Sequence, residues 1–232
     1  MPPPGTADPA FLFDLDGTLI DSVYQHVLAW HRALSAEGIE VSIWRIHRRI
    51  GMSGGLFAAA LFRETGRAFD TDTAERLRRR HAEAHGELGG TIRALPGARD
   101  LLGYLTETGV KWAVATSGRL ETARPALDLL GIDPDRVPFV TRDLVAHAKP
   151  NPDLFLEAAR RLEVDPRDAV VVGDSVWDLL AARRARSLGI GLLSGGYGES
   201  ELLAAGAYRV YEDPADMLAH IHEIGLRASR GG

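Results

Sequence analysis

The stretch "FLFDLDGTLIDS" (residues 11–22) joins a short apolar run to two aspartates and a glycine. The apolar residues are typical of a buried strand, and Asp14 and Asp16 stand where that strand ends. Positions i and i+2 of an extended chain point the same way, so both carboxylates are expected to face one cleft. Burying two like charges costs free energy, and a turn needs only one polar residue. The stretch therefore indicates a site that needs negative charge.

Beyond this stretch, short apolar runs alternate with helical patterns over most of the 232 residues. The runs are almost continuously apolar, as in parallel strands that are buried on both faces. We predict strands at residues 10–13, 111–116, 137–141, 168–172, 188–193 and 207–211, and helices at residues 97–108, 120–130, 152–163, 176–187, 199–205 and 214–224. This alternation predicts an α/β fold with a Rossmann-like parallel sheet.

One segment lacks strands. Between residues 23 and 90 only helical patterns occur, at 22–37, 43–50, 54–65 and 72–88. The stretch "GELGGTIRALPG" (86–97), which holds four glycines and a proline, is typical of a linker that returns to the main domain. We therefore expect a core of residues 1–22 plus 91–232, with an inserted helical domain at 23–90.

The composition narrows the classes of function. A formal net charge of −5 argues against a nucleic-acid-binding protein or one that binds an anionic membrane surface. The basic runs "RLRRRH" (76–81) and "ARRARS" (182–187) are typical of solvated helix faces. The absence of cysteine excludes disulfides, thiolate zinc sites and cysteine nucleophiles.

No stretch of 18 or more apolar residues occurs, so no membrane span is expected. The leader "MPPPGTADPA" (1–10) lacks the apolar centre of a signal peptide, and a cytoplasmic location is therefore expected. No feature of the sequence specifies an oligomeric state.

Polar residues follow several of the predicted strands, where ligands bind in open parallel sheets. They are Asp14 and Asp16, then Thr116, Ser117 and Gly118, then Lys149, and finally Asp174 and Asp178. Several carboxylates in one cleft need a cation, and all-oxygen ligands suit Mg²⁺. A hydroxyl, backbone amides and an ammonium suit a phosphate group. Together these groups predict phosphoryl transfer with Mg²⁺ as cofactor and a small-molecule phosphate ester as ligand.

The first two aspartates can divide the work. Asp14 can attack phosphorus while it also binds the metal, as aspartyl-phosphate chemistry requires. Asp16 can protonate the leaving oxygen and later accept a proton from water. Gly17 permits the tight turn that follows, and Thr18 can fix that turn by hydrogen bonding.

Four motifs of this chain resemble those of the haloacid dehalogenase superfamily, in the same order. They are "DLDGT" (14–18), "ATSG" (115–118), "KPNPD" (149–153) and "GDSVWD" (173–178). The resemblance implies that Asp14 is the nucleophile and a metal ligand, and that Asp16 is the acid/base and binds metal through its carbonyl. It also implies that Thr116 and Lys149 hold the phosphoryl group, that Asp174 binds the metal, and that Asp178 supports the metal site.

The same resemblance makes the helical insertion similar to a mobile cap that closes over substrate. His26 and Trp30 occupy positions that recur in family members acting on sugar phosphates. The loop "RIGMSG" (49–54), which includes Ser53, corresponds to a substrate-specificity loop. We expect Asp21 and Ser22 to cap the first helix of the insertion, and a capping role for Asp174 competes with metal binding.

Some residues distinguish between the classes of enzyme in this superfamily. Asp16 argues against a dehalogenase, which needs no acid for a halide, and the lack of lysine in residues 22–90 excludes a phosphonate-cleaving enzyme. A sugar-phosphate mutase of the β-phosphoglucomutase type is an alternative, although Gly54 stands where the mutase loop has an arginine. A catalytically silent binding module is a further alternative. We predict a Mg²⁺-dependent phosphatase for a small metabolite, either a sugar or polyol phosphate or a phosphoglycolate-like ester.

Overall fold

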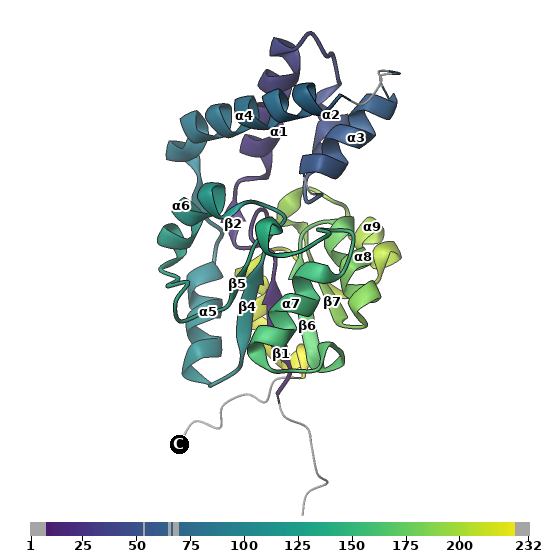
Figure 1. Cartoon of the computed structure of the whole chain (residues 1–232). Helices are drawn as coiled ribbons and strands as arrows, with labels where there is room; N and C mark the ends of the chain where they lie inside the picture. Colours follow the sequence, from purple (N-terminus) through teal and green to yellow (C-terminus); the bar gives the residue numbers. More distant parts are fainter. Residues whose placement is uncertain (1–7, 53, 65, 67–69, 226–232) are drawn as a thin grey trace, which may run out of the picture.

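The computed structural model describes residues 8–52, 54–64, 66 and 70–225. Its centre is a six-stranded sheet in the order β5-β4-β1-β6-β7-β8, and every neighbouring pair is parallel (Figure 1). The strands are β1 (Ala10–Phe13), β4 (Trp112–Ala115), β5 (Phe139–Val140), β6 (Ala169–Gly173), β7 (Leu188–Leu192) and β8 (Ala207–Tyr211). All six predicted strands are present, with slightly different ends, and the predicted Rossmann-like α/β core is confirmed.

Helices cover both faces of the sheet. They are α5 (Ala98–Glu107), α6 (Leu120–Leu130), α7 (Asp153–Leu162), α8 (Val176–Ala185), α9 (Glu199–Ala205) and α10 (Pro214–Ala219). Phe11 and Phe13 of β1 pack in one apolar cluster with α5, α6 and α10, whereas Leu12 packs in another with α7 and α8. Successive strand residues thus face opposite layers, and the burial of both faces explains the continuous apolar runs in the sequence.

Four helices lie between β1 and β4 in the chain: α1 (Val23–Ala36), α2 (Ile43–His47), α3 (Gly54–Glu64) and α4 (Thr71–Leu88). We call them the cap, and Figure 1 shows them above the carboxyl end of the sheet. The cap has its own apolar cluster, in which Trp30 stacks on Phe57 with ring centroids 4.2 Å apart. None of the described helices has the length and apolar character of a membrane span.

A short antiparallel pair that the sequence does not predict joins core and cap. Strand β2 (Ile20–Asp21) pairs with β3 (Arg93–Ala94), so the chain leaves the core and returns to it at one place. The proposed division into residues 1–22 plus 91–232 and residues 23–90 stays a prediction, and this pair lies beside both of its boundaries.

The prediction that Asp21 and Ser22 cap the first inserted helix is right in position but not in hydrogen bonding, and Asp174 does not cap α8. Ser22 occupies the position before α1, but its side chain makes no capping hydrogen bond and its hydroxyl donates to Asp16 instead. The residue before α8 is Ser175 rather than Asp174, and Asp178 accepts a hydrogen bond from the Ser175 N–H. Asp174 is thereby free of capping and its carboxylate faces the other acidic groups.

Candidate active site

The candidate site lies at the carboxyl ends of three adjacent strands. Asp14 follows β1, Thr116 follows β4 and Asp174 follows β6. Because β1 lies between β4 and β6, residues that are far apart in sequence meet at one edge of the sheet. The chain adds β4 and β5 on one side of β1 and then crosses to β6 on the other, and such a reversal of strand order is the usual place for a ligand in an open α/β sheet.

Lys149 is the buried cation of the site. It comes from the loop between β5 and α7, its side chain has no exposed surface, and its ammonium lies 5.0 Å from the Phe155 ring centroid. The Nζ atom donates to Asp14 and lies 2.8 Å from Asp178 Oδ1. Burial alone would lower the pKa of Lys149, but these two carboxylates raise it above the ordinary value. Lys149 is therefore held protonated.

Three buried carboxylates surround this ammonium. One oxygen from each of Asp14, Asp174 and Asp178 lies within 4.8 Å of the others. Burial raises the pKa of Asp14 to about 7, with repulsion from Asp178 adding to it and Lys149 opposing it. Burial, followed by repulsion from Asp178 and Asp14, raises the pKa of Asp174 well above its ordinary range. Ionisation of all three carboxylates would thus place more negative charge here than one lysine can balance.

This donor set fits a divalent metal ion. Three ionised carboxylates beside one ammonium leave two negative charges, which a divalent cation would balance. All-oxygen ligands without histidine or cysteine suit Mg²⁺. Thr18 Oγ1 donates to Asp174 Oδ1 at 3.0 Å and fixes the orientation of that carboxylate. The side chain of Asp16 lies outside this cluster, so a metal role for Asp16 is left to its backbone carbonyl and stays a prediction.

The carboxylate of Asp16 faces the cap. Its Oδ1 accepts a hydrogen bond of 2.6 Å from Ser22 Oγ, and His26 Nε2 lies 3.3 Å from the same oxygen. Burial would raise the pKa of Asp16, but His26 and Ser22 together hold it below the ordinary value. Although Asp14 and Asp16 are two positions apart, they therefore have different electrostatic surroundings.

The turn after β4 provides the expected phosphate-binding groups. Thr116 is buried, and its Oγ1 accepts a hydrogen bond of 2.9 Å from the Gly118 N–H, which fixes the turn. Ser117 Oγ donates to the Gly51 carbonyl at 2.8 Å and so joins the core to the cap loop. The hydroxyl of Ser117 is thus already bound, and a phosphate contact by Ser117 is left to its backbone N–H.

A cavity of about 210 Å³ opens beside these groups, between the core and the cap. The core contributes Asp14, Asp16, Thr116, Ser117, Gly118, Arg119, Thr122 and Arg142, and the cap contributes His26, Trp30, Arg49, Ile50, Gly51, Met52, Gly54, Gly55, Phe57, Arg78, His81 and Ala82. The volume is below the ~300–1,000 Å³ typical of small-molecule sites, which favours a small ligand. His26 and Trp30, both predicted to determine specificity, line this cavity, whereas the third such residue, Ser53, lies outside the described residues.

Helix α4 contributes histidines that the sequence reading missed. His81 Nε2 lies 3.1 Å from His26 Nδ1, and the ring of His85 stacks on His26 with centroids 4.0 Å apart. Burial, with a smaller effect of the neighbouring imidazoles, holds the pKa of His81 far below 6.5 and lowers that of His85 to about 4. Leu77, His81 and His85 recur every fourth residue, so helical periodicity could have placed them on one inward face.

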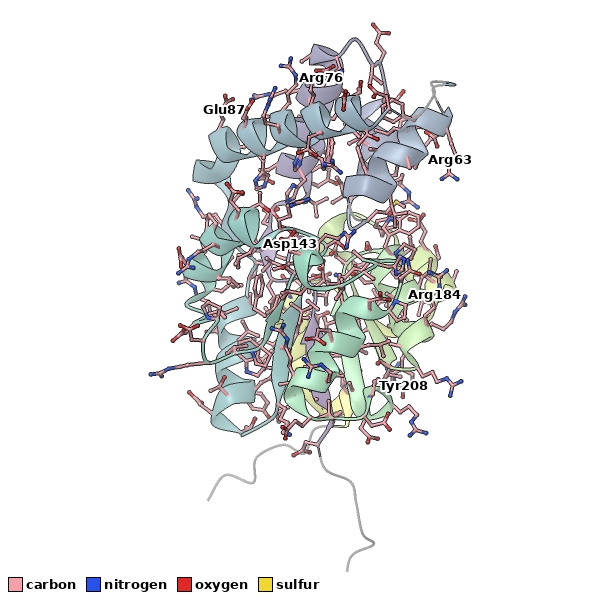
Figure 2. All side chains as sticks on the ribbon, in the orientation of Figure 1. Arg63, Arg76, Glu87, Asp143, Arg184 and Tyr208 are labelled. Atoms are coloured by element: carbon pink, nitrogen blue, oxygen red, sulfur yellow. The ribbon has the colours of Figure 1, made fainter. Side chains whose placement is uncertain are left out.

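The prediction that the run "RLRRRH" (76–81) is a solvated face is therefore only partly correct. Figure 2 shows Arg76 at the outer edge of the cap, where it pairs with Glu37. Arg79 is also exposed, with 66% of its side-chain surface accessible. Arg78 and His81, in contrast, line the cavity. The run divides between the two sides of α4 because residues three apart share a helix face.

Two glycines lie against Asp174: Gly17, which was predicted only to permit a turn, and Gly195, which the sequence does not single out. A Cβ atom on Gly195 would lie 1.8 Å from Asp174 Oδ2, and one on Gly17 would lie 2.6 Å from the same oxygen. Ser194 Oγ donates to the Gly17 carbonyl at 2.6 Å and holds the two loops together. The sequence around Gly195 indicates only a loop, so no local signal could have revealed this contact.

The cap loop is fastened to the core at the Arg48 carbonyl. Trp177 Nε1 donates to this oxygen at 3.2 Å, and the Tyr197 hydroxyl donates to it at 2.9 Å. His47 Nε2 donates to the Gly195 carbonyl at 2.8 Å. These contacts hold residues 49–52 of the loop "RIGMSG" (49–54) beside the cavity, and the role of the loop in specificity stays a prediction.

With this geometry established, comparison with known proteins gives the family. A family model described as haloacid dehalogenase-like hydrolase matches residues 9–186. The chain belongs to the haloacid dehalogenase-like hydrolases. This confirms the resemblance drawn from the four motifs, and it makes the chain a hydrolytic enzyme rather than a silent binding module.

Relatives and solved structures of these hydrolases agree with this assignment. Hexitol phosphatase A of Escherichia coli is 36% identical over 177 residues, which are 75% of this chain and 78% of that protein. A phosphoglycolate phosphatase of Rhodospirillum rubrum is 32% identical over 90% of this chain and 88% of its own length. The crystal structure of a hydrolase from Pseudomonas syringae has a TM-score of 0.91 and 53% identity, covering 93% of this chain and 99% of that one.

Proposed function

We propose that the chain is a Mg²⁺-dependent phosphatase that hydrolyses a small phosphorylated metabolite through an aspartyl phosphate on Asp14. The observation that carries this proposal is the buried cluster of Asp14, Asp174, Asp178 and Lys149, which adjoins the cavity between core and cap. The names of the two phosphatase relatives support a phosphate ester as substrate, either a hexitol-phosphate-like or a phosphoglycolate-like one.

In the first half of the reaction, a carboxylate oxygen of Asp14 forms a bond to phosphorus and the bond from phosphorus to the alcohol oxygen breaks. Lys149 holds Asp14 and stays protonated, so it can neutralise phosphoryl oxygens as well as orient the nucleophile. The Thr116 hydroxyl and the Ser117 N–H hold the remaining phosphoryl oxygens, because the Gly118 N–H is bound to Thr116 Oγ1. In the second half, water attacks phosphorus, the bond to Asp14 breaks and inorganic phosphate leaves.

Asp16 moves the proton in both halves. It donates a proton to the leaving alcohol oxygen and then accepts one from the attacking water. Its contacts with His26 and Ser22 favour the ionised form that the second half needs. In the first half, the negative charge of the bound phosphate beside it opposes ionisation and favours the protonated form.

Asp14, Asp174 and Asp178 would hold Mg²⁺, with the Asp16 carbonyl as a further ligand. When bound, the ion supplies positive charge that offsets repulsion between the nucleophile and the phosphate. Lys149 supplies only part of this positive charge, because it is already paired with two carboxylates. We further propose a cytoplasmic enzyme that acts on small molecules and binds neither nucleic acid nor membrane.

The test is release of inorganic phosphate from p-nitrophenyl phosphate and from a panel of phosphorylated metabolites, with Mg²⁺ and with EDTA. We expect release to require Mg²⁺ and to fall at least ~10³-fold in Asp14→Asn, because the nucleophile is lost. Asp21→Asn, a change at an exposed aspartate seven residues later, is the matched control. Release that survives Asp14→Asn would refute the mechanism.

The mutase alternative is tested in the same assay with β-glucose 1-phosphate. We expect free phosphate, and predominant formation of glucose 6-phosphate would favour the mutase. Solved structures titled β-phosphoglucomutase, such as the one from Bacteroides vulgatus with 22% identity and a TM-score of 0.83, are alike in fold alone.

A further inference from the structure

The two ends of the cavity differ in charge. Among the described residues that line it, the only carboxylates are Asp14 and Asp16, and both lie at the core end. The cap wall instead includes Arg78, beside Trp30, Phe57 and His81. Among these four side chains, only a ring nitrogen of His81 can accept a hydrogen bond. The wall is therefore suited to a ligand group that accepts hydrogen bonds and bears negative charge.

Four arginines line the cavity, and three of them contact protein groups away from the cap wall. Arg49 donates to Glu64 and to the Arg45 carbonyl. Arg119 pairs with Asp143, and Arg142 donates to backbone carbonyls in its own loop. Arg49 lies in the cap loop, and Arg119 and Arg142 lie on the core side of the cavity, so Arg78 is the arginine that α4 contributes to the cap wall.

Arg78 is different. Its Nε is buried and has no hydrogen-bond partner among the described residues. Among the described residues its only ion-pair partner is Glu75, which is 70% exposed and lies one turn away on the same helix. Exposed pairs of this kind contribute little and exchange readily with solvent. A buried donor without a partner costs free energy, and a ligand that takes the place of Glu75 on the guanidinium would give the Nε an acceptor as the side chain turns towards it.

Space for such a ligand is available beside the Arg78 side chain. A Cβ atom on Gly54 would lie 3.9 Å from Arg78 Cδ and 3.7 Å from Trp30 Cζ2, and one on Gly55 would meet nothing within 4 Å. The two glycines thus leave the approach to the guanidinium and the indole free of side chains. A guanidinium binds a carboxylate through two parallel hydrogen bonds, which is a geometry that a lysine cannot match.

We propose that the alcohol part of the substrate carries a carboxylate and that Arg78 binds it, so that Arg78 determines specificity. This inference rests on the proposed phosphatase function, in which the phosphate occupies the core end of the cavity. The carboxylate then lies at the cap end, and a substrate is recognised by an anionic group at each end. A neutral polyol phosphate would leave the Nε of Arg78 without an anionic partner.

Two pairs of esters test this, because each pair differs only by a carboxylate in place of a hydroxymethyl group. They are 3-phosphoglycerate with glycerol 3-phosphate, and 6-phosphogluconate with glucitol 6-phosphate. We expect the acid of at least one pair to exceed its neutral partner by about tenfold in kcat/KM, which corresponds to about 1.4 kcal/mol. In Arg78→Gln that ratio should fall to near one. In Arg79→Gln, an exposed neighbour on the same helix, the ratio should stay as in the wild type.

If neither ester of a pair is turned over, the same two compounds are compared as inhibitors of p-nitrophenyl phosphate hydrolysis, where the same ratio is expected. Equal or better use of the neutral esters by the wild type would overturn the proposal, as would an acid preference that survives Arg78→Gln. Arg78→Lys keeps the charge without the planar fork, and we expect an intermediate ratio. Melting temperatures of all variants exclude a folding defect as the cause.

Failure of this inference is distinguishable from failure of the phosphatase function. If p-nitrophenyl phosphate is hydrolysed with Mg²⁺ and Asp14→Asn abolishes the reaction, but no acid preference exists, only the role of Arg78 is refuted. If the wild type hydrolyses no phosphate ester at all, the phosphatase function itself is refuted, and the inference with it.

Discussion

Replacement of Lys149 by methionine tests the charge balance of the site. Lys149 has no exposed side-chain surface and faces Asp14 and Asp178, and methionine fills a similar volume without charge. Removing one partner of a buried ion pair costs ~3–5 kcal/mol, because the other charge is left buried without compensation. For a chain of this length, 1 kcal/mol shifts the melting temperature by ~2–4 °C. We therefore expect Lys149→Met in EDTA to melt about 6–20 °C below the wild type.

The same variant reports on the metal. Three carboxylates without the ammonium should bind Mg²⁺ more tightly than the wild-type site, and ligand at 100 times its Kd stabilises a protein by ~2.7 kcal/mol. The rise in melting temperature on adding Mg²⁺ should therefore be larger in Lys149→Met than in the wild type. At pH 5 the defect in EDTA should shrink, since carboxylates whose pKa is raised take up protons there.

Differential scanning calorimetry at pH 8 and pH 5, each with EDTA or Mg²⁺, measures these shifts. Lys111, the other lysine of the chain, is exposed, and Lys111→Met should change the stability by less than ~0.5 kcal/mol. A Lys149→Met protein that melts within about 2 °C of the wild type in EDTA at pH 8, or that responds to Mg²⁺ no more than the wild type, would refute the reasoning.

Three further changes probe the surroundings of the site. Burial lowers the pKa of His85 to about 4, so its contribution to stability is complete above pH 6.5 and is lost as the pH falls towards 4. In His85→Phe the free energy of unfolding, measured with urea at several pH values, should therefore fall by about 3 kcal/mol less than in the wild type between pH 6.5 and pH 4. Gly195→Ala should overlap with Asp174 Oδ2 and lower Mg²⁺ affinity at least ~10-fold by calorimetric titration, whereas Gly103→Ala, in open space on α5, should not. Ser22→Ala should reduce kcat by roughly 3- to 10-fold through loss of one hydrogen bond to the acid/base carboxylate, and an unchanged pH–rate profile would count against that role.

Most of the core could be predicted from sequence because its signals are local. The buried strands appear as continuous apolar runs, and each polar residue of the motifs stands directly after one of them. Parallel pairing then brings those ends together without any further information, as for Asp14 and Asp174 beside β1 and β6. The family match confirms the fold and the hydrolase class that this pattern predicted.

What could not be predicted depends on contacts between distant segments. Strands β2 and β3 have two residues each, too few for any periodic pattern, and they form only because each pairs with the other. The need for a glycine at position 195, where a Cβ atom would overlap with Asp174, likewise depends on two loops that are distant in sequence and close in space. Arg78 is an intermediate case. The spacing of Leu77, His81 and His85 predicts the inward face of α4, which Arg78 adjoins, whereas the basic run around Arg78 is typical of an exposed face.

The β2–β3 pair has a consequence for the modularity of this enzyme. Both ends of the cap lie side by side on neighbouring strands, where backbones are ~4.8 Å apart. Asp21 and Arg93 are registered partners, so a two-residue hairpin turn could connect them directly. The core chain would then run from β1 to α5 without interruption of its sheet. Cap exchange or deletion thus resembles the replacement of a hairpin loop, and lineages could change the leaving-group preference of the hydrolase while they retain one phosphoryl-transfer core.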